Sequence, residues 1–327
     1  MGLENKRVLV TGAGGFIGSH LAERLVKEGA QVRAMVHYNA LGSWGWLDHS
    51  DLTEGMEVYP GDITDAGSVA RAFVDIEIVF HLAALIAIPY SYLAPASYVR
   101  TNVEGILNVL NAARQQGAER VVHTSTSEVY GTAQTVPISE SHALQGQSPY
   151  SASKIAADKM AEAYYCSFEV PVVTVRPFNT FGPRQSARAV IPTIITQLLS
   201  GGGLNLGNLH PTRDLNYVEN IVDGFLAAAQ TDKALGRTVN LGSGKEISIA
   251  DLAQLIGKLA EVPVEINQEE RRLRPEASEV ERLMADNRLA KELLGWEPRI
   301  SLKQGLQQTI SWIGEHLNRY RSGEYAV

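Results

Sequence analysis

A glycine-rich turn between a strand and a helix constrains this chain more than any other segment. The β-branched run Arg7–Thr11 is typical of a strand buried on both faces. It leads into residues 12–18 (GAGGFIG), and helical periodicity follows from Ser19 to Glu28. A strand, a glycine turn and a helix in this order form the context of a dinucleotide-binding fingerprint. A glycine-rich loop alone is often only a turn, so the order of the three elements carries the prediction.

The glycines of this turn are expected to have separate roles. Gly12 allows the tight turn, Gly15 lets the backbone approach a pyrophosphate, and Gly18 lets the helix pack closely on the strand. The phosphates would lie at the helix N-terminus, where free amides attract anions. The residues expected to contact the cofactor here are Gly12, Gly14, Gly15, Phe16, Ile17 and Gly18.

Strand-like and helix-like runs alternate through the first half of the chain. This alternation predicts an α/β fold with a parallel, doubly wound sheet of the Rossmann type and a ligand at the carboxyl ends of the strands. The further expected strands are Gln31–Val36, Met56–Tyr59, Ile76–His81, Arg120–Thr126 and Val172–Arg176, with a helix at Thr101–Arg114.

The residue that usually separates NAD from NADP is missing. Many NAD sites place an acid at the end of the second strand, where it holds the ribose hydroxyls. Here the second strand ends in Val36-His37-Tyr38-Asn39, which contains neither an acid nor an arginine. His37 or Asn39 could bind the ribose, although each is equally well explained as an ordinary loop residue. We expect NAD as the cofactor, with NADP left open.

Further cofactor contacts are expected at three other strand ends. Asp62 follows the third strand, where it can meet the adenine edge, and Ile63 lies beside it. After the fourth strand, small residues would let the backbone lie close to the cofactor. The set expected at these ends is Asp62, Ile63, Leu82, Ala83, Ala84 and, after the sixth strand, Pro177.

A predicted helix carries a tyrosine and a lysine four residues apart. Ser148 can cap its amides, Pro149 suits its first turn, and good helix formers continue to Ala163. Tyr150 and Lys154 therefore share one face. A phenol beside an ammonium should have a pKa below its usual value of about 10, which would make it a base for a sugar or alcohol hydroxyl. Alone, such a pair usually marks a solvated helix face.

The fifth strand ends in hydroxyl residues and an acid. Thr126 falls where the strand end would meet the helix start at Tyr150, so its hydroxyl can bind the substrate oxygen. Glu128 follows two residues later. A carboxylate has no role in a simple alcohol oxidation, but it suits removal of a carbon-bound proton next to a carbonyl. Without the surrounding motif, Glu128 would be interpreted as a solvated loop acid.

These motifs together resemble the extended short-chain dehydrogenase/reductase superfamily over nearly the whole chain. The Thr-Ser-Glu of residues 126–128, before Val-Tyr-Gly, is similar to nucleotide-sugar 4,6-dehydratases and UDP-glucuronate decarboxylases, whereas 4-epimerases usually lack the Glu. Residues 38–39 with 44–48, 84–92 and 182–192 resemble the UDP-N-acetylglucosamine 4,6-dehydratases of legionaminic-acid-type pathways.

The resemblance implies a reaction site. Its catalytic residues would be Thr126, Ser127, Glu128, Tyr150 and Lys154, of which Tyr150 and Lys154 also contact NAD. Its nucleotide-sugar contacts would be Thr126, Asn179, Val190, Arg213 and Arg274. In the family, arginines at the last two places hold the diphosphate, which a guanidinium fork suits. For the neighbouring Arg271 and Arg272 we favour surface ion pairs.

One position departs from the dTDP-glucose dehydratases, which have Asp in place of Ser127 to protonate the leaving hydroxyl. With Ser there, as in the GDP-mannose dehydratases, Glu128 would act as both base and acid. The favoured hypothesis is 4,6-dehydration of a nucleotide hexose, most specifically UDP-N-acetylglucosamine. The alternatives are UDP-glucuronate decarboxylation, 4-epimerisation with an idle Glu128, and a catalytically silent cofactor-binding regulatory module. The intact Thr126, Tyr150 and Lys154 argue against the last.

The length of 327 residues favours two lobes or one large α/β domain. We expect a Rossmann domain at residues 1–180, rejoined by 215–245, and a smaller C-terminal α/β substrate lobe within 181–327. The strand and turn at residues 239–244 would join the lobes, helices are expected at Ile249–Ala260 and Leu302–His316, and residues 320–327 should form a loose tail.

The net charge of −7 argues against a nucleic-acid surface or a polybasic membrane patch. With Cys166 as the single cysteine, neither a disulfide framework nor a cysteine metal cluster is expected, and no metal is predicted. No apolar run approaches the ~20 residues needed to span a bilayer, and no signal-peptide pattern precedes the first strand. We therefore expect a cytoplasmic protein. The family resemblance adds a homodimer that pairs through residues 96–113 and 150–167.

Overall fold

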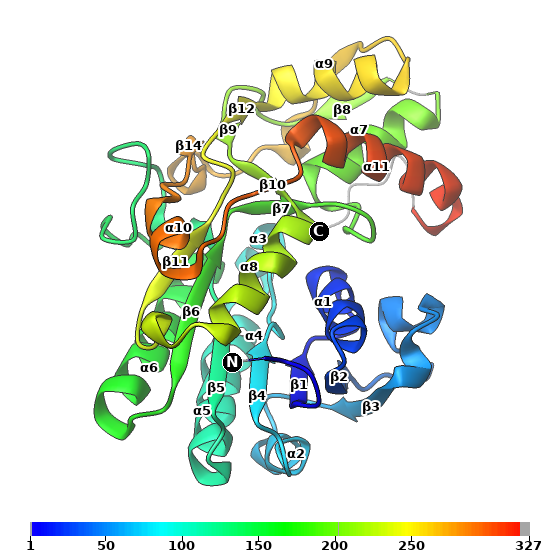
Figure 1. The fold of residues 1–327 in the computed structure, drawn as a ribbon. Helices are drawn as coiled ribbons and strands as arrows, with labels where there is room; N and C mark the ends of the chain where they lie inside the picture. Colours follow the sequence, from blue (N-terminus) through cyan, green and yellow to red (C-terminus); the bar gives the residue numbers. More distant parts are fainter. Residues whose placement is uncertain (1, 202, 321–327) are drawn as a thin grey trace.

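A seven-stranded parallel sheet forms the centre of the computed structural model, which describes residues 2–201 and 203–320 (Figure 1). The strand order is β11-β6-β5-β4-β1-β2-β3. The chain starts at β1, runs out to β3, and returns to β4 on the other side of β1, which creates a switch point between β1 and β4. The strands are β1 (Arg7–Thr11), β2 (Gln31–His37), β3 (Met56–Gly61), β4 (Ile78–His81), β5 (Arg120–Thr124), β6 (Val172–Pro177) and β11 (Thr238–Leu241).

Helices cover both faces of this sheet because its strands are apolar on both faces. In β1, Val8 and Val10 belong to the cluster that packs with α1 and α8, whereas Leu9 belongs to the cluster of α2, α5 and α6. This doubly wound Rossmann arrangement confirms the predicted fold class. The helices are α1 (Phe16–Lys27), α2 (Ala66–Ala72), α5 (Gly105–Gln116), α6 (Pro149–Phe168) and α8 (Val218–Gln230).

Among the predicted boundaries that differ from the structure, two lie near the candidate site. β5 ends at Thr124 instead of Thr126, because the Thr126 hydroxyl accepts a hydrogen bond from the Glu128 amide (3.2 Å) and caps a 3₁₀ turn at Ser127–Tyr130. The helix predicted from Thr101 begins as a regular α-helix only at Gly105, after the short helices α3 (Ile88–Leu93) and α4 (Pro95–Tyr98) and a π-helical stretch at Val99–Glu104.

A smaller α/β lobe lies at the carboxyl ends of the strands, at the top of Figure 1. Its short strands pair across long sequence separations. It contains α7 (Val190–Leu199), α9 (Ile249–Ala260) and α11 (Leu302–Glu315), with β7 (Asn179–Phe181), β8 (Leu204–Leu206), β9 (Thr212–Arg213), β10 (Leu215–Tyr217), β12 (Ile247–Ser248), β13 (Ile266–Gln268) and β14 (Arg282–Leu283). The short helix α10 (Arg288–Leu294) lies instead beside β11 of the large sheet (Figure 1).

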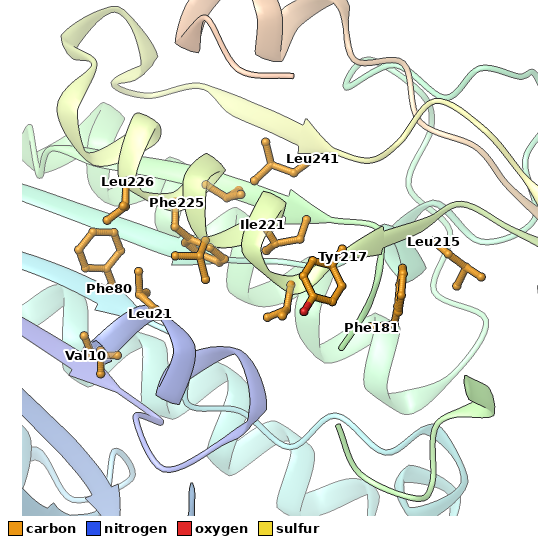
Figure 2. Close-up of a cluster of buried hydrophobic side chains, with 14 of the residues drawn as sticks. Val10, Leu21, Phe80, Phe181, Leu215, Tyr217, Ile221, Phe225, Leu226 and Leu241 are labelled. Atoms are coloured by element: carbon orange, nitrogen blue, oxygen red, sulfur yellow. The ribbon is translucent and has the colours of Figure 1, made fainter. Parts of the chain in front are cut away.

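One hydrophobic cluster continues from the sheet into this lobe. Figure 2 shows it running from Val10 and Phe80 past Phe225 on α8 to Phe181 and Leu215. Fully burying each such side chain contributes about 1.5–3 kcal/mol, so this shared cluster is a strong connection between the lobes. The chain returns to the sheet through α8 and β11, which pairs with β6. The division into domains 1–180 and 181–327 stays a prediction.

Within the described residues, no helix combines the length and the apolar character that crossing a bilayer requires. Apart from Tyr320, the predicted tail at residues 320–327 lies outside the described part of the chain.

Candidate active site

The glycine turn has the geometry of a phosphate cradle. Gly12 has a φ of +73°, and a Cβ there would lie 2.8 Å from the Ala83 nitrogen. A Cβ on Gly18 would lie 2.2 Å from the Gly12 carbonyl oxygen, so only glycine permits this approach of α1 to the turn. No side chain among the described residues caps the start of α1 at Gly15. Its first amides are therefore available to the phosphates of a dinucleotide.

Gly14 lies against the loop that follows β2, which leaves no room for a side chain. A Cβ there would lie 2.4 Å from the Trp44 carbonyl oxygen, and a Cβ on Gly45 would lie 2.4 Å from the Gly14 oxygen. The Trp46 amide also donates to the Gly14 oxygen (3.0 Å). Residues 43–49, here called the cover loop, thus rest directly on the glycine turn. On its outer side the Trp46 ring meets Trp312 of α11, with ring centroids 5.4 Å apart.

The end of β2 presents few side-chain groups that could bind a ribose. The Asn39 side chain closes its own loop, because its oxygen accepts from the amides of Leu41 and Ser43 and its nitrogen donates to the Ser43 oxygen (2.6 Å). This favours the ordinary-loop interpretation of Asn39. His37 is exposed at the strand end. Its role with the cofactor stays a prediction.

The other predicted cofactor residues line the neighbouring strand ends. The Asp62 carboxylate accepts from the Thr64 amide and hydroxyl, and Ile63 is buried beside Gly105. The amides of Leu82 and Ala83 both donate to the Thr11 hydroxyl (3.2 Å), which fastens this segment, followed by Ala84, to the end of β1. Pro177 is the buried last residue of β6.

Tyr150 and Lys154 are both buried, so they do not form a solvated helix face. They are 7% and 4% exposed, on a helix that begins with a capping box between Ser148 and Ser151. The prediction of a lowered phenol pKa is wrong for this structure. Burial raises the pKa of Tyr150, a hydrogen bond with Thr126 lowers it only in part, and the charge of Glu128 raises it further. Lys154 donates to the Thr124 carbonyl oxygen (2.6 Å), away from the phenol.

The strand-end acid is inside the site. Glu128 is 9% exposed, Ser127 is 2% exposed, and Thr126 lies between the two elements that carry Glu128 and Tyr150. The Glu128 carboxylate acts electrostatically on Tyr150 and on Arg213. The structure therefore brings together residues from β5, α6 and the smaller lobe. The solvated-acid interpretation of Glu128 does not hold.

The two predicted diphosphate arginines converge on one carboxylate. The Arg213 Nη2 lies 3.3 Å from Glu279 Oε1, and the Arg274 Nη1 lies 3.7 Å from the same oxygen. The Arg274 Nη1 is buried without a hydrogen-bond partner among the described residues. Burial lowers the pKa of Arg213, and the charge of Arg274 lowers it further, whereas Glu128 raises it. The two guanidinium groups therefore favour the binding of an anion in addition to the Glu279 carboxylate.

Sequence reasoning missed Glu279, because no local pattern shows which acid will face Arg213, which is far away in the sequence. Arg271 and Arg272 both pair with Glu269, in agreement with the expected ion pairs, although Arg272 is largely buried. Asn179 starts β7 and leaves its buried side-chain oxygen without a hydrogen-bond partner among the described residues. Val190 starts α7 and is partly exposed.

The parallel sheet, the β1–α1 glycine turn and the buried tyrosine–lysine pair on α6 define an extended short-chain dehydrogenase/reductase, which confirms the superfamily prediction. Within it, the chain belongs to the GDP-mannose 4,6 dehydratase family, whose profile matches residues 9–309.

Relatives of known activity cover several reactions. The UDP-glucuronic acid decarboxylase 1 of Xenopus tropicalis is 32% identical over 98% of this chain and 75% of its own length. The UDP-glucose 4-epimerase of Mycolicibacterium smegmatis is 33% identical over 94% of this chain and 98% of its own. A dTDP-glucose 4,6-dehydratase from Streptomyces venezuelae, crystallised with NAD, has a TM-score of 0.88 at 29% identity, covering 96% of this chain and 99% of that one. Similarity therefore shows that the chain belongs to a family of NAD-dependent nucleotide-sugar enzymes. Which reaction it catalyses has to be inferred from the residues of the site.

Proposed function

We propose that this protein is a 4,6-dehydratase that acts with NAD on a nucleotide hexose, most specifically UDP-N-acetylglucosamine. The observation that carries the proposal is the buried Glu128, which acts electrostatically on both Tyr150 and Arg213. An acid in that place is idle in a 4-epimerase but necessary for an elimination. The product would be the 4-keto-6-deoxy sugar nucleotide.

The diphosphate end of the substrate is held by Arg213 and Arg274. Both are directed at Glu279, and Arg274 keeps a buried Nη1 free of hydrogen bonds among the described residues. A diphosphate can take several charge-assisted hydrogen bonds from two guanidinium groups. Asn179, whose buried oxygen also lacks a partner in the described structure, is an acceptor for a sugar hydroxyl.

The residues on the strand end and helix start move the protons. Tyr150, hydrogen-bonded with Thr126, takes the proton of the C4 hydroxyl. NAD, when bound, supplies the hydride acceptor, a positive charge in its oxidised form and, later, the hydride that returns to C6. The C4 ketone acidifies the C5 proton, and the Glu128 carboxylate removes it. With Ser127 beside it in place of an acid, Glu128 then gives this proton to the hydroxyl that leaves C6 as water. When hydride returns to C6, C5 takes up one proton, which balances the proton that Tyr150 removed from the C4 hydroxyl.

The raised pKa of the Tyr150 phenol sets a condition on this mechanism. Burial and the Glu128 charge both oppose a phenolate. Tyr150 therefore works as a base only when positive charge is added near it, and the oxidised cofactor supplies such a charge. This ties proton removal to cofactor binding.

The test is incubation of the protein with UDP-N-acetylglucosamine, UDP-glucose, GDP-mannose and UDP-glucuronate, with the products identified by mass. Loss of one water from a hexose nucleotide supports the proposal. Loss of carbon dioxide from the glucuronate would identify a decarboxylase instead. An isomer of unchanged mass would identify an epimerase, and no conversion of any of the four would favour a catalytically silent module.

We also propose a homodimer that pairs through the helices around α4 and α6. An apolar groove runs between them, and Val99 beside it is 52% exposed. The groove is lined by Pro95, Ala96, Val99, Val103, Pro149, Ala152, Ser153 and Ala156. Val99→Glu should convert a dimer into a monomer in light scattering, and an unchanged mass would reject this surface.

A further inference from the structure

A buried carboxylate lies behind the tyrosine–lysine pair, and the proposed reaction does not use it. Tyr150, Lys154 and Asp158 follow one another at intervals of four on α6, so they share one face of the helix. Asp158 is only 5% exposed. A buried charge is costly unless it is paired and hydrogen-bonded, so the partners of Asp158 indicate why it is there.

Those partners come from two neighbouring strands. One Asp158 oxygen accepts hydrogen bonds from the Ser125 hydroxyl (2.7 Å) and from the Nε (3.1 Å) and Nη2 (2.9 Å) of Arg176. The other oxygen lies 3.2 Å from the Nε2 of His123. His123 is in β5, Ser125 follows it, and Arg176 is in β6. Asp158 thus fastens α6 to the carboxyl ends of both strands.

Arg176 extends the network to the far side of the strand-end motif. Its Nη1 donates to the Tyr130 hydroxyl (2.9 Å), which in turn donates to the Asn240 side-chain oxygen (2.7 Å). Ser125 and Tyr130 therefore flank residues 126–128 on both sides. The position of the proposed hydroxyl and base relative to Tyr150 depends on the carboxylate that joins these groups.

The Asp158 carboxylate also favours the charged form of Lys154. Burial lowers the pKa of Lys154 to about 8, and the Asp158 charge opposes that fall. Burial would raise the pKa of Asp158, but the His123 hydrogen bond and the Arg176 charge lower it to about 2. Burial also lowers the pKa of both His81 and His123, so these rings are neutral at pH 7. The groups that face Lys154 are Tyr150 and Asp158 of α6, His81 of β4, His123 and the Thr124 carbonyl of β5, and, through Asp158, Arg176 of β6.

We propose that Asp158 is a positioning residue that fixes α6 against the strand ends and keeps Lys154 in its ammonium form inside the site. The Asp158 carboxylate remains negative throughout the neutral pH range and cannot reach solvent. Without it, the ammonium would share a buried region with a second cation, Arg176. The inference rests on the proposed function only for the assignment of Lys154 to the site.

The test is a titration of Lys154 that needs no substrate. The full chain is labelled with ¹³C at lysine Cε, the Lys154 resonance is assigned from its absence in Lys154→Arg, and its shift is followed with pH. In the wild type the midpoint should lie near pH 8. In Asp158→Asn, loss of a nearby opposite charge should make the ammonium about tenfold more acidic. An unchanged midpoint in folded Asp158→Asn would overturn the proposal.

Two further variants make the result specific. Glu162→Gln removes an exposed carboxylate of the same helix, paired with Lys159, and should leave the Lys154 midpoint unchanged. A shift equal to that of Asp158→Asn would show a general charge effect and overturn the proposal. Asp158→Glu keeps the charge and should titrate near the wild type. If Asp158→Asn does not fold, the titration of the wild type still tests the proposal. A Lys154 midpoint below pH 7 would mean that Asp158 does not keep the ammonium charged.

Discussion

Replacement of Gly45 by alanine should destabilise the protein more than replacement of Gly42, although both lie in one loop with nearly the same backbone. Their φ angles are +67° and +66°. An alanine in this left-handed region costs about 1–2 kcal/mol at either position. A Cβ on Gly42 would meet nothing within 4 Å, so Gly42→Ala measures that backbone cost alone.

Gly45→Ala adds a collision with the glycine turn. Its Cβ would lie 2.4 Å from the Gly14 oxygen, whereas ordinary contact begins at 3.4 Å. Relieving the overlap requires the cover loop to move away by about 1 Å, which takes the 3.0 Å bond between the Trp46 amide and the Gly14 oxygen out of hydrogen-bonding range. That loss costs about 1 kcal/mol. Gly45→Ala should therefore exceed Gly42→Ala by about 1 kcal/mol or more.

The assay is urea unfolding followed by circular dichroism, with NAD affinity measured by calorimetry on the same samples. Because the cover loop rests on the glycine turn, its displacement should also make Gly45→Ala bind NAD more weakly than Gly42→Ala, which should keep the wild-type Kd. Equal unfolding free energies and equal NAD affinities in the two variants would refute the reasoning that the cover loop and the turn support each other.

Three other perturbations test the site. Glu128→Gln should lower water loss by about 10²–10⁴-fold while single-turnover reduction of bound NAD persists, and dehydration at the normal rate would remove Glu128 as the base. Arg274→Gln should weaken UDP binding by roughly 10-fold or more, since a charge-assisted hydrogen bond contributes about 1.5–3 kcal/mol, whereas the exposed Arg271→Gln should bind UDP normally; equal affinities would reject the diphosphate role. Because the pKa of Asp158 is depressed from 3.8 to about 2, its ionisation stabilises the fold above pH 4 by about 2 kcal/mol, and this is lost as the pH falls through 2. The stability difference between wild type and Asp158→Asn in urea should therefore narrow between pH 5 and 2, and a constant difference would contradict the assignment.

The fold was predictable because its signals are local. Apolar strands, the glycine turn and the capping residues of α6 all act over a few neighbouring residues, and each is present in the sequence. The pairs of β8 with β13 and of β9 with β14 were not predictable in the same way. These strands have only two or three residues, and what selects them is packing between distant segments.

The residues of the candidate site were easier to predict from the sequence than the directions of their pKa shifts. Tyr150 and Lys154 were predicted from helix spacing and Glu128 from the strand-end motif, and the structure buries all three. The direction of the Tyr150 pKa was missed, because helix spacing shows the neighbouring lysine but not the burial that outweighs it. Asp158 was open to the same spacing argument, one turn beyond Lys154. Glu279 was not, because its partner Arg213 is distant in sequence.

The packing of the cover loop against α11 provides an intrinsic fluorescence probe. Three of the protein's four tryptophans belong to the cover loop or pack on it: the Trp44 carbonyl lies over Gly14, and the ring of Trp46 lies 5.4 Å from that of Trp312. The fourth, Trp296, is buried elsewhere and donates to the Asn220 oxygen (2.8 Å). Intrinsic fluorescence therefore reports mainly on the cover loop and its contact with α11. Any ligand that displaces the cover loop from the glycine turn can be followed in unlabelled protein, with Trp296 as an internal reference.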